Sequence, residues 1–219
     1  MTFPCVYYII YTNEKVNEVF YLKMNKAISD LLNKNNGIIK ASDAKLSGIT
    51  NKELQNLTKK GTLERVAFGL YISSEQFSDE YLITQYRCPK GIFSYETALY
   101  FNNLSDRTPL KLTLTIPTGY NTRLLKEKDE YQFYYCKEDI HELGVINVKS
   151  PYGNDIRIYD KERTICDCIK KKSVLDKDIV LSAIKEYLSE TGNDYAKLLR
   201  YAEILKIRDK VRQYMEVLI

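Results

Sequence analysis

Histidine and cysteine are scarce in this 219-residue sequence, which restricts the metal and redox chemistry that the chain can support. His141 is the only histidine, and the cysteines number five, an odd set with irregular spacing. Such a set suits free thiols in a reducing compartment better than a disulfide framework, so we expect a cytoplasmic protein. Cys166 and Cys168 lie close together, but zinc requires four converging ligands, and we expect no metal site. The remaining cysteines are Cys5, Cys88 and Cys136.

Long hydrophobic runs are also missing. No segment approaches the roughly 18 to 20 apolar residues that a helix needs to cross a bilayer, so we expect no membrane partner. Residues 3–11 are apolar but lack the positively charged start and small-residue cleavage site of a signal peptide, and we expect a short strand there. Because Met24 directly precedes the first helical pattern, we interpret residues 1–23 as an extension that either belongs to the native protein or precedes its natural start.

The common catalytic motifs do not occur either. The sequence has no Gly-rich phosphate loop, no G-x-S-x-G and no H-E-x-x-H, and His141 has no obvious nucleophile. We interpret His141 as a surface or capping residue. Asp160 and Glu162 flank Lys161 at an expected strand-to-helix junction, where the helix dipole favours carboxylates; a metal-dependent nuclease is the alternative. We therefore predict that the protein is not an enzyme and needs no cofactor.

Charge is abundant, nearly balanced overall and unevenly distributed. Lys and Arg number 33 against 29 Asp and Glu, a net excess of +4, and hydrophobic residues make up 44%, enough for a substantial core. Between Lys26 and Arg65, eight basic residues face four acidic ones, so this segment alone carries an excess equal to that of the whole chain. Four to six phosphate contacts from it would give strongly salt-dependent binding, with a log–log slope of roughly −4 to −5.

Three helices are expected in this basic segment. Apolar spacing predicts the first over residues 25–34 and a compact second over residues 41–46, joined by a bridge of extended chain at Ile38 and Ile39. The third begins at a capping box in which the Thr50 side chain caps the amide of Glu53 and Glu53 reaches back. Gly61 supplies its C-terminal cap.

Two short β-prone runs at residues 63–66 and 69–72 follow, and they predict a hairpin. Helix, short turn, capped helix and hairpin within about fifty residues is the order of a winged helix-turn-helix, whose second motif helix fits the DNA major groove. We therefore predict a winged helix-turn-helix DNA-binding domain over residues 24–76.

Residues 77–219 predict a second domain of mixed α+β type, which makes the whole chain α+β. Helices are expected at residues 79–86 and 94–100, and strands at residues 131–136, 146–148 and 156–159. Leu112, Leu114 and Ile116 alternate with threonines, which predicts a half-buried strand ended by Pro117. Three amphipathic helices close the sequence, with apolar stripes centred on Ala183, Ala202 and Val211.

Candidate DNA-binding residues follow from the predicted third helix and the hairpin. In the first turns of that helix, amide side chains can pair with adenine and a lysine can reach guanine acceptors; cations further along suit phosphates, and a hairpin arginine suits a neighbouring minor groove. Phe68 at the hairpin turn would be exposed in this picture, or would pack on the second domain. The candidates are Thr50, Asn51, Lys52, Gln55, Asn56, Lys59, Lys60, Arg65, Lys40 and Lys45.

Several runs resemble the AbiEi antitoxins of bacterial type IV (abortive-infection) toxin-antitoxin systems. Residues 37–72 are similar to the N-terminal winged helix of that family. The runs IFSYETAL at residues 92–99, LSDRTP at residues 104–109 and DKERTICD at residues 160–167 are similar to its second domain. The resemblance covers residues 24–219.

The resemblance implies an antitoxin that counters a nucleotidyltransferase-like AbiEii toxin without a stable complex. It also implies repression of its own operon by binding inverted repeats in double-stranded DNA, with a free monomer and two copies on DNA. A basic face of the second domain would assist; by charge alone, the candidates are Arg107, Lys111, Arg123 and Lys126. Two alternatives remain open: a winged-helix regulator that senses a ligand, and a protein-interaction module without nucleic-acid binding.

Overall fold

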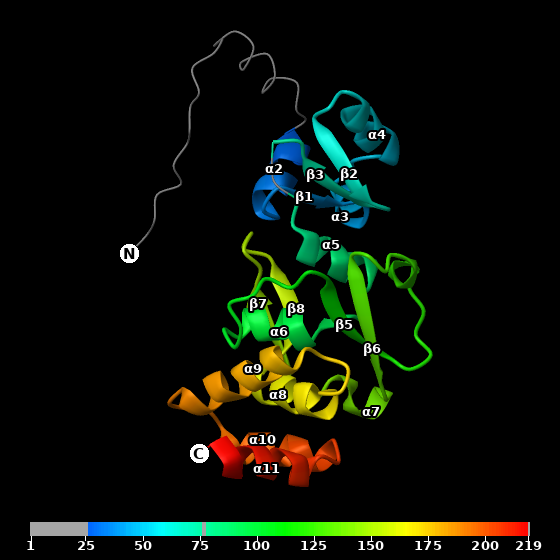
Figure 1. Ribbon diagram of the computed structural model, residues 1–219. Helices are drawn as coiled ribbons and strands as arrows, with labels where there is room; N and C mark the ends of the chain where they lie inside the picture. The colour runs from blue at the N-terminus through cyan, green and yellow to red at the C-terminus, as the bar shows by residue number, and fades with distance from the viewer. Residues whose placement is uncertain (1–25, 76–77, 219) are drawn as a thin grey trace. The chain divides into compact units, whose positions relative to one another are not determined.

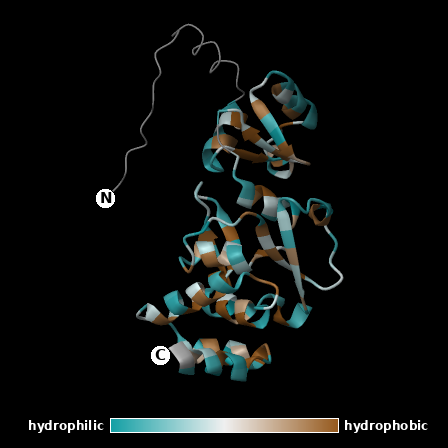
Figure 2. Ribbon diagram, in the orientation of Figure 1, coloured by the Kyte–Doolittle hydropathy of each residue, from teal (hydrophilic) through white to brown (hydrophobic). Residues whose placement is uncertain are grey.

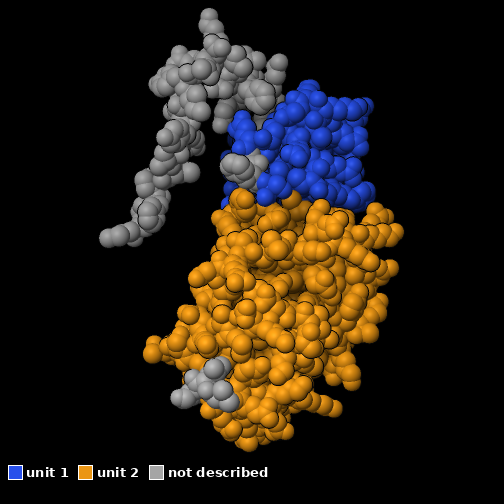
Figure 3. Space-filling view, viewed as in Figure 1, with its two compact units in different colours: residues 1–78 blue, residues 79–219 orange. Residues whose placement is uncertain are grey.

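The computed structural model describes residues 26–75 and 78–218 of the chain (Figure 1). It has the predicted α+β composition and divides into two compact units, residues 1–78 and 79–219 (Figure 3). The predicted extension over residues 1–23 and the strand within it lie outside the described residues. None of the helices in the described ranges combines the length and the apolar character that spanning a bilayer requires.

Within residues 26–75, unit 1 contains three helices and a three-stranded antiparallel sheet of order β1-β3-β2. The predicted helices and hairpin are present. The bridge predicted at Ile38 and Ile39 is a strand instead, because these residues pair with Ile72 and Tyr71 of the hairpin. The elements are α2 (Lys26–Lys34), β1 (Ile38–Lys40), α3 (Ala41–Leu46), α4 (Asn51–Lys59), β2 (Leu63–Ala67) and β3 (Leu70–Ser73).

The core of unit 1 collects the apolar face of each element. Leu31 and Leu32 of α2 meet Ile39 of β1, Leu54 of α4 and Leu63 of β2, all of them buried. Leu54 is completely inaccessible to solvent, so truncating it to alanine would cost roughly 2–5 kcal/mol of stability. This burial fixes which side of α4 faces inward.

Unit 2 is built on a mixed five-stranded sheet of order β6-β5-β4-β8-β7. The β5–β6 and β4–β8 pairs are parallel, and the other two pairs are antiparallel. The elements are α5 (Glu80–Arg87), β4 (Ile92–Phe93), α6 (Tyr95–Phe101), β5 (Leu112–Pro117), η1 (Arg123–Lys126), β6 (Tyr131–Cys136), α7 (Glu138–His141), β7 (Val145–Lys149), β8 (Asp155–Tyr159), α8 (Lys161–Lys170), α9 (Lys177–Ser189), α10 (Tyr195–Ile204) and α11 (Arg208–Leu218).

Strand β5 is buried on both faces, so the prediction of a half-buried strand is wrong. Its leucines lie in the apolar core, while its threonines face the segment that begins α6. Thr113 shares hydrogen bonds with Thr97, including 3.0 Å between the two hydroxyl oxygens, and the Thr115 hydroxyl donates to Ser94 Oγ at 2.9 Å. Because a partner satisfies each hydroxyl, the alternating polar residues can be buried.

The last four helices form the second core of unit 2. Each predicted stripe contributes buried residues there: Ala183 of α9, Ala202 of α10 and Val211 of α11 pack in one cluster with residues of α6 and α8. The prediction for His141 as a surface or capping residue is wrong. It is 3% exposed, with Nε2 3.4 Å from the Thr115 carbonyl oxygen, because α7 packs against β5.

Candidate nucleic-acid interface

Helix α4 has both ends fixed by its own sequence. At its start, Glu53 N donates to Thr50 Oγ1 at 3.2 Å, and Thr50 N donates to Glu53 Oε2 at 2.8 Å, which confirms the predicted capping box. These bonds, first that from the Thr50 backbone, lower the pKa of Glu53. At its end, Gly61 has φ +73°, and the amides of Gly61 and Thr62 donate to Thr58 and Leu57. The two motifs determine where α4 begins and ends.

The two sides of α4 differ in chemistry. Leu54 is buried, and Leu57 packs partly against the same core. The opposite side is solvent-exposed and carries amides and lysines at spacings i, i+3, i+4 and i+7, which place them on one stripe. Figure 2 shows the predominance of hydrophilic residues on this helix. The exposed residues of this stripe are Asn51, Lys52, Gln55, Asn56 and Lys59, flanked by Thr50 at the N-cap and Lys60 at the C-cap, while the acidic Glu53 is exposed beside the stripe.

The dimensions of this helix suit a DNA groove. Nine residues rise about 13 Å, and the major groove of B-DNA is about 12 Å wide. Amide side chains can pair with the N6 and N7 atoms of adenine, and a lysine can donate to guanine O6 or N7. The stripe therefore combines amide and ammonium groups of the kinds that can contact bases and phosphates.

The basic residues that the structure describes in unit 1 have no carboxylate partner. The ion pairs found among the described residues all lie in unit 2, and within residues 26–75 none of the lysines is paired. Lys40 at the end of β1 and Lys45 on α3 are exposed as well. These cations can therefore neutralise phosphates without first breaking an internal ion pair.

Arg65 and Phe68 form the tip of the β2–β3 hairpin. Arg65 Nε donates to the Ala67 carbonyl at 3.3 Å, and the guanidinium carbon lies 5.3 Å from the centre of the Phe68 ring. Phe68 is 86% exposed.

The four basic candidates of unit 2 are all exposed, but their surroundings differ. Lys111 Nζ donates to the Lys128 carbonyl at 2.7 Å, just beyond η1, which carries Arg123 and Lys126. Arg107 instead lines a cavity of about 270 Å³ with Asp178 and Glu186 of α9.

Sequence reasoning missed a basic run in unit 2. Lys170, Lys171 and Lys172 are exposed at the end of α8, and Lys172 Nζ lies 5.3 Å from the centre of the Tyr214 ring on α11. Three consecutive lysines are the signal that could have identified it. These three lysines form a second group of exposed cations in unit 2, in addition to the candidates Arg107, Lys111, Arg123 and Lys126.

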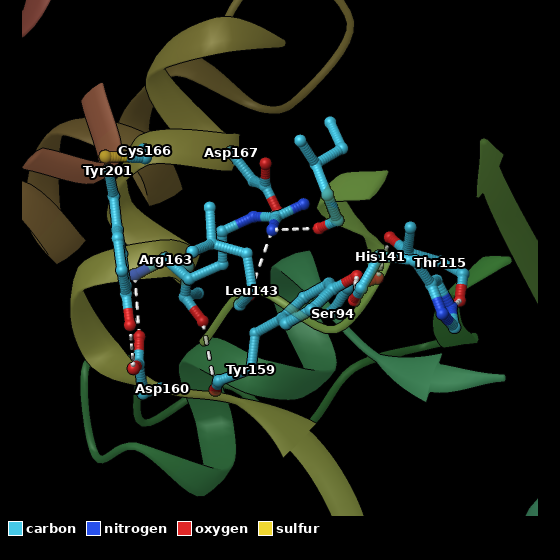
Figure 4. A network of polar contacts seen from close by, with 12 residues as sticks. Ser94, Thr115, His141, Leu143, Tyr159, Asp160, Arg163, Cys166, Asp167 and Tyr201 are labelled. Carbon is cyan, nitrogen blue, oxygen red and sulfur yellow. Dashed lines mark hydrogen bonds and ion pairs between the residues drawn. The ribbon is translucent and has the colours of Figure 1, made fainter. Parts of the chain in front are cut away.

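Arg163 is the centre of a buried polar network in unit 2 (Figure 4). Its Nε pairs with Asp167 at 2.9 Å, its Nη1 donates to the carbonyls of Ile140 and Leu143 at 2.8 and 2.9 Å, and its guanidinium stacks on Tyr159 at 4.3 Å. Desolvation opposes the charge of Arg163, but Asp167 outweighs it and raises the arginine pKa. Because the Arg163 side chain is only 1% exposed, it cannot contact a ligand. Its role is structural, since its hydrogen bonds to Ile140 and Leu143 hold α8 against the segment from α7 to β7.

Asp160 begins α8 as its N-cap, as the helix-dipole interpretation predicts. Its Oδ1 accepts from Arg163 N at 2.8 Å, and Oδ2 pairs with Lys197 at 2.9 Å and accepts from the Tyr201 hydroxyl at 3.2 Å. Lys197 also pairs with Glu162 at 3.0 Å. Desolvation lowers the pKa of Lys197, but hydrogen bonds and charges from the two carboxylates raise it overall.

The cysteines that the structure describes are free thiols. Burial raises the pKa of the Cys166 and Cys168 thiols, which keeps both protonated. In residues 26–75 and 78–218, no three His, Cys, Asp or Glu side chains converge in a way that could hold a metal ion.

No protein-family model matches the chain, and no curated protein matches it significantly. The resemblance to AbiEi antitoxins therefore remains a prediction, and the geometry of unit 1 is the main support for a function.

Proposed function

We propose that unit 1 is a winged helix-turn-helix domain that binds double-stranded DNA with α4 in the major groove. The order α2, β1, α3, α4, β2, β3 with a three-stranded antiparallel sheet supports this assignment. The turn between α3 and α4 spans residues 47–50 and contains Gly48 at φ +78°, in keeping with the short glycine-containing turn of the motif.

One observation carries the proposal: the exposed stripe of α4 combines amides with lysines that have no carboxylate partner. An isolated basic face is often only solvated. This one lies on a helix fixed at both ends, opposite a fully buried leucine, and next in sequence to a hairpin with an exposed arginine. That combination suits a duplex better than a protein-interaction surface.

We further propose that the chain represses its own operon and acts as the antitoxin of a type IV toxin-antitoxin pair. The support is the resemblance of residues 24–219 to AbiEi antitoxins. By that resemblance two copies would bind inverted repeats, and an AbiEii-type toxin would be countered without a stable complex. The basic groups of unit 2 would add backbone contacts.

DNA binding is tested by fluorescence anisotropy with a labelled duplex taken from directly upstream of the gene. The variant Lys52→Ala with Gln55→Ala should lose roughly 1–3 kcal/mol of binding free energy for each true base contact, and it should no longer distinguish that duplex from a scrambled one. Glu64→Ala, an exposed change on β2, is the control and should retain discrimination. Full discrimination by the double variant would show that α4 does not read the bases.

The antitoxin role is tested genetically. If the chain is an antitoxin, its gene can be deleted only when the neighbouring toxin gene is also deleted. If a strain that lacks only this gene were viable and grew fully while the toxin was expressed, the antitoxin role would be contradicted. The proposal that unit 1 binds DNA would not be affected by that result.

A ligand-sensing regulator is the second candidate, favoured by the cavity beside Arg107. Its volume of about 270 Å³ is slightly below the usual range of small-molecule sites, and its lining carries three carboxylates, Asp106, Asp178 and Glu186, beside the single cation. A metabolite that changed operator affinity in wild type but not in Arg107→Ala would favour this candidate.

A further inference from the structure

The tip of the β2–β3 hairpin is built unusually for an exposed turn. A β-bulge lies between Arg65 and Ala67, where the pairing register with β3 shifts. Gly69 has φ +72°, a conformation that favours glycine, and its carbonyl accepts the Ala41 amide at 2.8 Å. The turn is therefore tied to the start of α3, and the bulge redirects the side chains of β2 at this point.

Phe68 is the exposed residue of this turn. Leaving such a ring in water forgoes roughly 1.5–3 kcal/mol that its burial would provide, so its position calls for a physical explanation. The neighbour that it contacts is Arg65, whose guanidinium lies over the ring. Arg65 Nε is already used by the Ala67 carbonyl, while the terminal nitrogens make no hydrogen bond within the described residues.

We propose that Phe68 is a positioning residue that holds Arg65 in the orientation required to enter an A·T-rich minor groove. The ring and the Ala67 carbonyl hold the guanidinium at two points, which leaves its terminal nitrogens available to donate to a ligand. Narrow A·T-rich minor grooves have an enhanced negative potential that attracts an inserted arginine. A guanidinium held in advance loses less conformational entropy on binding than a free one.

This inference rests on the proposed DNA-binding function and adds a source of specificity to it. Helix α4 would read base edges in the major groove, and the Arg65–Phe68 pair would read the width of the adjacent minor groove. The operator would then prefer A·T pairs at positions that α4 does not contact.

The test is a double-mutant cycle of Arg65→Ala and Phe68→Ala, measured by anisotropy. Two duplexes are used: the upstream duplex, and one in which the A·T pairs flanking the α4 footprint are replaced by G·C. On the first duplex, Phe68→Ala should weaken binding about 2- to 5-fold, the range of an exposed cation–π contact. In the Arg65→Ala background it should cause no further loss, and both single variants should reduce the preference for the first duplex.

Conservative variants separate positioning from simple apolar contact. Phe68→Tyr keeps the ring and should retain the preference, whereas Phe68→Leu keeps only apolar bulk and should lose it. Additive losses in the cycle, or full preference in Phe68→Leu, would overturn the inference without affecting the major-groove proposal. Absence of any duplex binding by the wild-type chain would instead refute the proposed function, and this inference with it.

Discussion

Substituting Lys59 and Lys60 at the end of α4 gives the most quantitative test of which residues of the proposed interface contact phosphates and which contact bases. Both are exposed and lack a carboxylate partner among the described residues, and they follow the turns of the helix that we propose to contact bases. We expect them to contact phosphates. Replacing both with glutamine removes the charge while keeping similar length and helix propensity, so the fold of unit 1 should not change.

The magnitude follows from counterion release. Each phosphate contact contributes about 0.9 to the log–log slope of affinity against salt, so the double variant should lower the slope by about 1.8. Across a fourfold change in salt concentration, the wild type should lose about 12-fold more affinity than the variant. The loss at low salt should be the same for operator and scrambled duplexes, because phosphate contacts carry no sequence information.

Anisotropy titrations over a salt series measure this slope directly. The matched control is Lys177→Gln with Lys185→Gln, two exposed lysines on α9 whose removal changes the net charge equally. If the control pair lowers the slope as much, the effect belongs to overall charge and not to α4. An unchanged slope in the Lys59 and Lys60 variant would refute the assignment of these residues to phosphates.

Four further predictions concern stability, each measured by urea denaturation. Thr50→Ala should cost about 1 kcal/mol through the loss of the α4 cap. The folded-state pKa of Glu53 is lowered, so its capping bonds stabilise the fold fully above the ordinary pKa of 4.5 and are lost as the pH falls from there through the lower folded value. Glu53→Gln should therefore flatten the dependence of stability on pH within that window, and an unchanged acid profile would contradict this. Arg163→Ala should cost roughly 3–5 kcal/mol because it leaves the Asp167 carboxylate buried without a partner, and a loss no larger than that of an exposed lysine would show that the network is unimportant. Gly144→Ala should also destabilise unit 2 strongly, since its φ is +78° and a Cβ would lie 2.8 Å from Arg163 Cβ; wild-type stability would show that the backbone can relax there.

Local signals in the sequence were sufficient to predict most of the helices and strands that the structure describes in unit 1. The capping box at Thr50, the glycine at residue 61 and the apolar spacing of Leu54 and Leu57 determine α4 through contacts within a few residues, and they also determine which side is exposed. The candidate residues of α4 could therefore be predicted because helix periodicity alone places them on one stripe.

Features that depend on distant pairing could not be predicted in the same way. Strand β1 has three residues and β4 only two, and each is a strand because of partners elsewhere in the chain. The alternation in β5 correctly indicated a strand, but its polar side is buried because Thr97 and Ser94 arrive from α6 and its N-cap. For the same reason His141 is buried, although nothing near it in the sequence indicates this.

The pairing of β4 has a consequence for the order in which the protein forms during synthesis. The described helices and strands of unit 1 all come from residues 26–73, so its sheet can close once that stretch has left the ribosome. β4 lies between β5 and β8, and β8 is absent until residues 155–159 have been translated. A nascent chain would thus display the α4 surface well before the larger sheet is complete.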